Sequence, residues 1–398
     1  MKGLRLYLSP FAPDTSGAAA VFFGLGALTV IVDAGGCAGN IAGFDEPRWQ
    51  RGRSAVFSAG LRDMDAIMGR DDHLVAKLQL AAEDIAADFI ALVSSPVPAV
   101  IGTDFRALAR LGKKATGLPV VTADCDGTRL YDKGAGKAWL ALMKEFVGQD
   151  TGEKAAGKTV GLLGVTPLDF SEAEAARLAE RAQADGAQVL LYGAGVENSR
   201  AYSGAAAAAE SGALFATNVG AQFIAPTPLC QTTPLSSTTS STVINGLPAL
   251  RHAHTATENI VVSAQGLRAA KWLQQHFGTP YRADSLLAAD DLALLRAQHS
   301  LTGTEKILLI HESVRVLSLR RLLQAELPDA QITAASWFMP AEEAGTLDAH
   351  LTEEDDLAEL VNRLQPDLIL ADKALLRALP NYQETFIDWP HYAVSGAR

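Results

Sequence analysis

Cys37 lies in a glycine-rich turn that follows an apolar run expected to form a strand. Residues 30–40 read VIVDAGGCAGN, and Gly35, Gly36 and Gly39 leave the backbone uncrowded beside the thiol. Open α/β sheets bind ligands in the crevice outside the carboxyl ends of their strands. A thiolate held there among free backbone amides suits an iron–sulfur cluster, because the thiolate binds iron and the amides can donate hydrogen bonds to sulfides. The alternative is a small buried cysteine without a ligand role.

Cys125 repeats this arrangement. A strand expected over residues 120–122 leads into Asp124-Cys125-Asp126-Gly127. The two flanking carboxylates raise the pKa of the thiol unless a metal ion offsets their charge, which favours a metal ligand over a free reactive thiolate. The alternative is an ordinary loop cysteine. Because two thiols at the ends of two parallel strands can reach one ligand, we predict two metal ligands and five residues that line the bound group. The ligands are Cys37 and Cys125, and the lining residues are Gly35, Gly36, Gly39, Asp124 and Gly127.

The third cysteine, Cys230, is expected to take no part in this site. It lies in a Ser/Thr/Pro-rich stretch with no strand or glycine turn before it. The three cysteines are odd in number and widely spaced, which is not the pattern of a disulfide framework. In a reducing compartment such cysteines are free, catalytic or metal-bound.

Residues 152–159 match the sequence pattern of a phosphate-binding loop but not its structural context. The segment GEKAAGKT fits the pattern Gly-x-x-x-x-Gly-Lys-Ser/Thr. Such a loop needs a strand before its glycines and, after them, a helix whose N-terminal amides face the phosphates. Here a helix is expected before the motif and the strand VGLLGV after it. We therefore interpret the segment as a linker and not as a nucleotide site.

The elements that must position the cysteines alternate between strands and helices. Short β-rich apolar runs are followed by Gly or Pro turns and Ala/Leu-rich segments, a pattern that predicts an α/β fold with parallel sheets covered on both faces. The expected strands are Leu4–Leu8, Leu28–Asp33, Phe89–Val93, Val120–Thr122, Thr159–Leu163, Val189–Tyr192, Ile260–Val262, Ile307–His311, Gln331–Ser336 and Leu368–Leu370. The expected helices are Ser16–Leu25, Asp72–Ala87, Thr103–Leu111, Gly136–Val147, Ser171–Asp185, Ala264–Phe277, Ser313–Leu327 and Leu357–Leu364.

Two polar segments divide the chain into three Rossmann-like domains. They are the linker GQDTGEKAAGK at residues 148–158 and HSLTGTE at residues 299–305. Residues 205–257 are too rich in Ser, Thr and Pro for a compact strand–helix repeat, and we interpret them as an inserted loop that covers a neighbouring surface. The predicted domains are a cluster-binding domain over residues 1–150, a second over 151–300 that carries the insertion, and a third over 301–398.

The bulk composition excludes several classes of function. The chain has 398 residues, of which 48% are apolar, so it can bury two or three cores. Its net charge of −11 and the absence of a Lys/Arg-rich run argue against nucleic acid or an anionic membrane as a partner. No segment reads as a signal peptide or a membrane span, so we expect a soluble, cytoplasmic protein.

Several segments together resemble the nitrogenase component-1-type oxidoreductases. The resemblance covers most of the chain and is tightest before residue 130. It rests on LSP at residues 8–10 with DAGGCAGN around Cys37, FSAGLRDMDAIMGRDDHL at 57–74, LVSSPVPAVIGTDF at 92–105, VTADCDGT at 121–128, GLLGVTPLDF at 161–170 and NIVVSAQGLRAAKWLQQHFGTPY at 259–281.

The resemblance implies three Rossmann-like domains, paired subunits and electrons delivered by a separate ATP-hydrolysing iron–sulfur reductase. By this comparison Cys37 falls on the middle cluster cysteine of the family and Cys125 on its last. Ser9 stands where the first cluster cysteine is expected. Ser263 stands where nitrogenase itself carries the cysteine of its catalytic metal cofactor, so we do not expect dinitrogen reduction.

Three functions remain open at this point. The leading one is the catalytic component of a nitrogenase-like reductase that passes electrons to a substrate, with a tetrapyrrole-like substrate inferred by analogy. The second is a scaffold that assembles or carries a metal cluster without turnover. The third is a binding module that has lost its redox centre.

The ligand count bears on the oligomeric state. A four-iron, four-sulfur (4Fe–4S) cluster usually takes about four protein ligands, whereas Cys37 and Cys125 supply two. A two-fold axis through the cluster would supply each thiolate twice, and we favour such a homodimer. A similar but distinct subunit could complete the set instead, or Asp124 or Asp126 could serve as an oxygen ligand.

Overall fold

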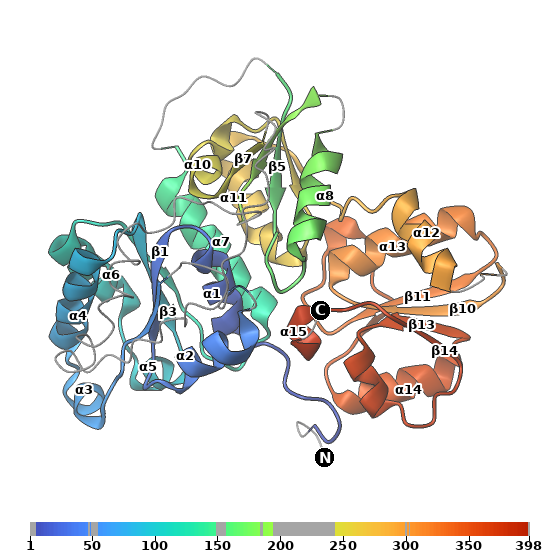
Figure 1. Ribbon diagram of the computed structural model, residues 1–398, viewed down its shortest axis with the longest axis horizontal. Coiled ribbons are helices and arrows are strands. Elements are labelled where there is room, and N and C mark those ends of the chain that lie inside the picture. The colour runs from blue at the N-terminus through green and yellow to red at the C-terminus, as the bar shows by residue number, and fades with distance from the viewer. Residues whose placement is uncertain are drawn as a thin grey trace, which may run out of the picture.

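The computed structural model describes residues 5–46, 48, 55–148, 157–183, 186–193, 243–298, 301 and 303–396. Within them the chain forms three parallel sheets, each in one continuous part of the sequence (Figure 1). This confirms the predicted α/β fold with three Rossmann-like, parallel-sheet units. The exact domain boundaries stay a prediction.

The first sheet has the strand order β2-β1-β3-β4, and all three pairings are parallel. Its central strands β1 and β3 are buried along their whole length, as their uninterrupted apolar sequences require. The strands are β1 (Ala27–Val32), β2 (Ala55–Ser58), β3 (Phe89–Ser94) and β4 (Val120–Ala123). The helices are α1 (Asp14–Phe23), α2 (Gly36–Asn40), the π-helix η1 (Ile41–Asp45), α3 (Asp63–Met68), α4 (Asp71–Asp84), α5 (Pro96–Ile101), α6 (Phe105–Thr116) and α7 (Tyr131–Phe146).

The second sheet has the order β7-β6-β5-β8-β9, again parallel throughout. Helix α8 covers one face, and α10 and α11 cover the other (Figure 1). The strands are β5 (Thr159–Leu163), β6 (Gln188–Leu191), β7 (Val243–Asn245), β8 (Glu258–Val261) and β9 (Tyr281–Ala283). The helices are α8 (Glu172–Ala182), α10 (Gly246–Arg251), η3 (Ala253–Thr255), η4 (Ala264–Gly266), α11 (Leu267–Phe277) and α12 (Ala289–Gln298).

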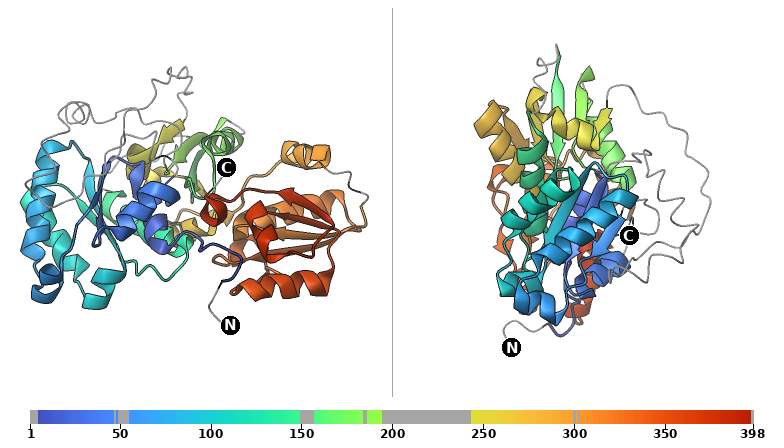
Figure 2. Two further views of the ribbon diagram at one scale, coloured as in Figure 1. Left: turned by 60° about the horizontal axis from the view of Figure 1, so that its bottom comes forward. Right: turned by 90° about the vertical axis from the view of Figure 1, so that its left-hand side faces the viewer.

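The third sheet has the order β12-β11-β10-β13-β14 and is also parallel. The left view in Figure 2 shows this unit, in orange and red, beside the other two. The strands are β10 (Lys306–Ile310), β11 (Gln331–Ser336), β12 (Ala349–His350), β13 (Leu368–Ala371) and β14 (Thr385–Asp388). The helices are α13 (Ser313–Glu326), η5 (Glu342–Ala344), α14 (Glu354–Leu364), η6 (Lys373–Ala378) and α15 (Tyr392–Ser395).

Helices α1 and α7 cross at very close range beside the first sheet. Every residue of α1 is buried. A Cβ atom on Gly17 of α1 would lie 1.9 Å from the carbonyl oxygen of Tyr131, and one on Gly134 of α7 would lie 1.8 Å from that of Asp14. Only glycine permits this approach, which fixes the first residue of α1 against the start of α7.

The C-terminal helix α15 returns to the centre of the molecule (Figure 1). The Ala393 amide donates to the carbonyl of Leu168, and the Ala393 carbonyl accepts from Ala12 at 2.8 Å. The Tyr392 hydroxyl donates to the Phe44 carbonyl at 2.9 Å. This segment therefore ties all three units together.

Two sequence predictions are wrong in part. The described residues of the predicted strand Leu4–Leu8 are not a strand, because the amides of Tyr7 and Leu8 donate to the Glu354 carboxylate and not to a neighbouring strand. The predicted insertion ends too late, since residues 243–257 contain β7, α10 and η3 of the second unit. The rest of the insertion, with Cys230, lies outside the described residues.

None of the helices in the part of the chain that the structure describes is long and apolar enough to cross a membrane.

Candidate metal centre at the first sheet

The carboxyl ends of β1, β3 and β4 bring the predicted ligand residues to one edge of the first sheet. The strand order switches sides between β1 and β3, because β2 lies on one side of β1 whereas β3 and β4 lie on the other. The crevice at such a switch point is where open parallel sheets bind ligands. Cys37 follows β1 at this point. Cys125 follows β4, which is two strand spacings from β1, or roughly 10 Å.

The turn before Cys37 depends on glycine. Gly35 has φ 118° and ψ −23°, a left-handed conformation that side chains rarely adopt. The buried Asp33 carboxylate holds the turn, because it accepts from the Ala38 amide at 2.9 Å and from the Ser58 hydroxyl at 2.6 Å. Cβ atoms on Gly36 and Gly39 would meet nothing within 4 Å, so both glycines leave open space beside the half-buried thiol.

The surroundings of Cys37 disfavour a bare thiolate. Burial raises the pKa of the Cys37 thiol, and the charge of Asp33 raises it further. A hydrogen bond with the Ser95 hydroxyl offsets part of this rise. Ser95 follows β3 and also donates to the Val32 carbonyl at 2.8 Å, so the end of β3 is anchored beside the Cys37 turn.

Cys125 is held by the first residue of α1. Its side chain is buried, and its Sγ lies 3.5 Å from the carbonyl oxygen of Asp14. The Asp14 carboxylate accepts from the amides of Asp126 at 3.2 Å and Gly127 at 2.8 Å. Asp14 therefore clamps the loop that carries Cys125.

The charges around Cys125 keep it neutral. Burial raises the pKa of this thiol far above its usual value, and the carboxylates of Asp14, Asp124 and Asp126 add to the rise. Lys137 opposes it, and the Lys137 ammonium donates to the Asp124 carbonyl. The thiol therefore needs a nearby cation to ionise, as a metal ligand does.

The Ser95–Pro96 step connects the two cysteine segments. Gly127 has φ 75°, and a Cβ atom there would lie 2.6 Å from Cγ of Pro96. Ser95, one residue earlier, contacts Cys37. The turns that carry Cys37 and Cys125 thus pack on either side of one dipeptide.

The two carboxylates beside Cys125 differ in their hydrogen bonds and exposure. Asp126 accepts from the amide of Thr128 at 2.8 Å and from its hydroxyl at 2.5 Å, and these bonds lower the pKa of Asp126. Asp124 is exposed. Across the described ranges, no group of three or more His, Cys, Asp or Glu is placed to hold a metal ion.

Exposed apolar side chains surround this edge of the sheet. Figure 1 shows α2, α3 and α5, which follow β1, β2 and β3, at the same lower edge of the first unit. Val100 is 86% exposed, Ile67 75% and Phe44 71%. Exposed apolar side chains gathered on neighbouring elements are typical of a protein–protein contact. We call this group the apolar rim; it consists of Phe44, Met64, Ile67, Met68, Val97, Val100 and Ile101.

Ser9 lies in a segment that is anchored on the third unit. Its neighbour Leu8 donates to Glu354 at 2.6 Å, and the Phe11 ring packs edge-on against Trp337 with centroids 5.5 Å apart. Ser9 itself is exposed.

A second polar cluster, which the sequence analysis missed, lies where the three units meet. Asp169 follows β5, and its side chain is fully buried. Tyr131, at the start of α7, donates to Asp169 Oδ1, and Nε2 of His391 lies 3.1 Å from the same oxygen. Burial raises the pKa of Tyr131, and the Asp169 charge adds to the rise. One carboxylate thus joins residues of the first, second and third units.

Ser263 belongs to this junction. It is fully buried after β8, and its hydroxyl donates to Asp169 Oδ2 at 3.1 Å. Gln265 donates to the same oxygen and to the Thr166 hydroxyl at 2.9 Å. The position that resembled a cofactor ligand is therefore filled by a hydrogen-bond network. No sequence motif predicts this network, because its members Tyr131 and His391 lie 260 positions apart in the sequence.

Comparisons with known proteins identify relatives of this fold. The family model described as "Nitrogenase component 1 type Oxidoreductase" matches residues 14–293. The solved structure "Nitrogenase Cp1 at pH 6.5" has a TM-score of 0.63 and 12% identity, over 98% of this chain and 87% of that chain. "Nitrogenase Cp1 at pH 5" has a TM-score of 0.63 and 13% identity, over 97% of this chain and 84% of that chain. At such identities the structures show a shared fold. No curated protein matches the sequence.

Proposed function

The chain belongs to the nitrogenase component 1 type oxidoreductases, and from this membership we propose that it is the catalytic component of a two-component reductase. In this proposal Cys37 and Cys125 bind an iron–sulfur cluster of the 4Fe–4S type at a subunit interface. A separate ATP-hydrolysing iron–sulfur reductase delivers the electrons. The observation that carries the proposal is the pair of cysteines at one edge of the first sheet, Cys37 half-buried and Cys125 buried.

The residues at this edge suit such a cluster. Gly36 and Gly39 leave room beside the Cys37 thiol. Both thiols sit where burial and carboxylates raise their pKa, so a bound cationic centre would stabilise their thiolates. When bound, the cluster would supply one-electron transfer.

The protein residues then hold and shield the site. Asp33 fixes the Cys37 turn, and Asp14 fixes the Cys125 loop. Burial of the apolar rim against a second subunit would exclude water from both thiols. Each fully buried Val or Phe side chain contributes about 1.5–3 kcal/mol to such an association before its costs.

A symmetric homodimer completes the ligand set most simply. One chain offers two thiolates, and a two-fold axis doubles them across a self-complementary surface. A similar but distinct subunit is the alternative partner. Of the two possible oxygen ligands, Asp124 is exposed, whereas Asp126 is already bound to Thr128.

The junction around Ser263 does not suit a second metal cofactor. Its hydroxyl is committed to Asp169, and the space is occupied by the buried side chains of Tyr131, Gln265 and His391. We therefore derive no step through a cofactor at that position.

The substrate and compartment are further parts of the proposal. A tetrapyrrole-like substrate is inferred by analogy with family members that carry a reduced cysteine set. A reducing, cytoplasmic location fits free thiols. ATP hydrolysis is assigned to the separate reductase, because residues 152–159 lie between helix α7 and strand β5, the reverse of a phosphate-binding loop.

Anaerobic purification of four proteins tests the proposal. Wild type and Cys230→Ser should retain iron and sulfide, whereas Cys37→Ser and Cys125→Ser should each lose them. Loss of iron in Cys230→Ser alone would refute the assignment. Turnover with the cognate reductase and ATP then separates an enzyme from a scaffold, because a scaffold would carry the cluster without consuming a substrate.

A further inference from the structure

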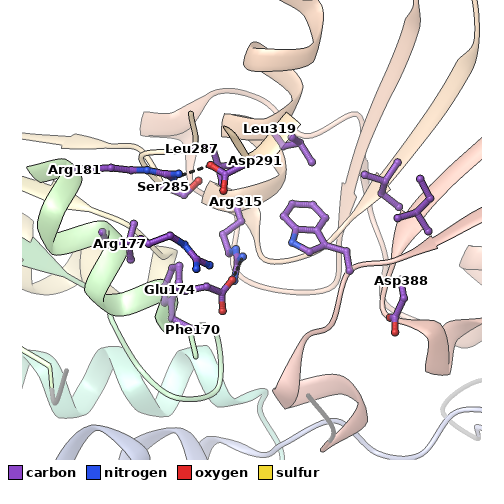
Figure 3. A pocket seen from close by; sticks show the side chains of 14 residues that line it. Phe170, Glu174, Arg177, Arg181, Ser285, Leu287, Asp291, Arg315, Leu319 and Asp388 are labelled. Atoms are coloured by element: carbon purple, nitrogen blue, oxygen red, sulfur yellow. Dashed lines mark hydrogen bonds and ion pairs between the residues drawn. The ribbon is translucent and has the colours of Figure 1, made fainter. Parts of the chain in front are cut away.

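A cleft of about 210 Å³ lies between the second and third units. Helix α8 forms one wall, while β13, β14 and the residue after β14 form the opposite one (Figure 3). All of its lining residues belong to these two units, so the cleft is separate from the thiols of the first sheet. Nothing in the proposed cluster site depends on it.

Most of the charges that line the cleft are already paired. Arg315 lies 2.7 Å from Glu174, and Arg181 lies 2.7 Å from Asp291. Figure 3 shows the second pair at the upper edge of the cleft. These groups shape the walls but leave no net charge for a ligand.

Arg177, the remaining basic residue in the lining, is not paired with an acid of the cleft. Asp388, the remaining acid in the lining, lies 3.6 Å from the Lys373 ammonium. Arg177 makes no hydrogen bond or ion pair with any residue that the structure describes. Figure 3 shows its side chain extending from α8 toward Arg315 and Glu174. The cleft therefore presents one unpaired cation.

Arg315 adds a flat, buried side chain beside two aromatic rings. Its side chain is only 6% exposed, and its buried Nε has no hydrogen-bond partner in the described structure. Its Cζ atom lies 4.8 Å from the ring centre of Phe170 and 5.5 Å from that of Trp389. The Nε–H is covered by protein atoms, so it is not a contact for a ligand.

Apart from Ser285, the remaining lining is apolar. Leu178, Leu287 and Leu370 line the cleft together with the Trp389 indole. Apolar walls with a few placed polar groups are typical of small-molecule sites. The volume is below the roughly 300–1,000 Å³ of sites for drug-sized ligands, so the occupant is smaller than these and far smaller than a macrocycle.

We propose that this cleft binds a small aromatic carboxylate. The carboxylate pairs with the Arg177 guanidinium. The ring packs against the Trp389 indole and the leucines. The single unpaired cation selects a monoanion, and the aromatic wall selects a flat body over a short aliphatic acid.

Fluorine NMR titrations of the full chain test this site with three probes. Para-fluorobenzoate has both the ring and the charge, fluoroacetate lacks the ring, and para-fluorobenzyl alcohol lacks the charge. Para-fluorobenzoate should bind saturably, and each of the other probes should bind at least about tenfold more weakly. Arg177→Gln should weaken para-fluorobenzoate binding by at least about tenfold, because it removes a charge-assisted hydrogen bond.

Two controls complete the experiment. Arg110→Gln replaces an exposed arginine on α6, away from the cleft, and should leave the affinity unchanged. Cys37→Ser should also leave it unchanged, which separates this site from the proposed cluster. Absence of saturable para-fluorobenzoate binding, or equal affinity in wild type and Arg177→Gln, would overturn the proposal.

Discussion

Replacing Asp14 tests whether the start of α1 positions Cys125. The Asp14 carboxylate accepts from the amides of Asp126 and Gly127 at 3.2 and 2.8 Å. Asp14→Asn keeps one acceptor oxygen, whereas Asp14→Ala removes both. The two variants therefore release the Cys125 loop in two steps.

The size of each step follows from these contacts. Hydrogen bonds to charged groups contribute about 1.5–3 kcal/mol each. Burial raises the pKa of Asp14, which means that the carboxylate bears a desolvation cost in the folded state. That cost outweighs the extra strength that the charge gives these bonds, so each counts as an ordinary hydrogen bond, and we expect a loss of about 0.5–1.5 kcal/mol for Asp14→Asn and about 1–3 kcal/mol for Asp14→Ala.

Urea unfolding of the reduced apoprotein measures the stability, and iron per chain measures the site. Asp104→Ala is a matched control, because Asp104 also accepts from two amides at the start of a helix, Arg106 at 2.9 Å and Ala107 at 3.0 Å. This control should lower the urea midpoint through the lost helix cap but keep all the iron. Asp14→Ala should lose iron as well as stability. Full iron retention in Asp14→Ala would refute the claim that the clamp positions Cys125.

Three further predictions follow from other parts of the fold. Val100→Asp in the apolar rim should shift the protein toward monomers in analytical ultracentrifugation, whereas Leu111→Asp on α6 should not; equal behaviour would contradict the assigned interface. Burial works to raise the pKa of Glu174, but Arg315 and hydrogen bonds outweigh it and hold that pKa at about 2. Because folding lowers this pKa, the ionised carboxylate stabilises the folded state above pH 4.5, and this stabilisation is lost as the pH falls toward 2. Glu174→Gln should therefore lower the free energy of unfolding at neutral pH by roughly 2–3 kcal/mol. It should also weaken the dependence of the urea midpoint on pH in the acid range. The isolated chain should show no ATP binding by calorimetry, and Lys158→Ala should not change this result. ATP binding by the wild type that is lost in Lys158→Ala would instead show that residues 152–159 form a nucleotide site.

The sequence predicted the central strands well and missed edge strands. Strands β1, β3 and β5 are buried along their length and read as continuous apolar runs. The five missed strands, β2, β7, β9, β12 and β14, all lie at sheet edges. They are short and only partly buried, so their sequences carry neither an apolar run nor a clear alternation.

The two wrong segments fail for related reasons. Leu4–Leu8 has the apolar content of a strand, but its amides bind a carboxylate 346 to 348 positions away in the sequence, and no local pattern reveals that partner. The end of the predicted insertion contains β7, a three-residue edge strand that its Ser/Thr-rich context conceals.

Local sequence predicted that both cysteines lie after the carboxyl ends of strands, and the structure has them after β1 and β4; their role as ligands stays a prediction. The glycine turn before Cys37 and the Asp124–Gly127 loop could both be recognised without the fold. The clamp by Asp14 and the junction around Asp169 could not, because their partners come from distant parts of the chain. The family resemblance seen in the sequence is confirmed by the match over residues 14–293.

Iron per chain, measured together with mass in solution under anaerobic conditions, tests the central claim most directly. The chain has a mass of 42.0 kDa, so a homodimer has a mass of about 84 kDa. A cluster shared across a two-fold axis predicts that dimer with about two irons per chain. Loss of iron should accompany dissociation in Val100→Asp. A monomer that retains a complete cluster would contradict the interfacial site.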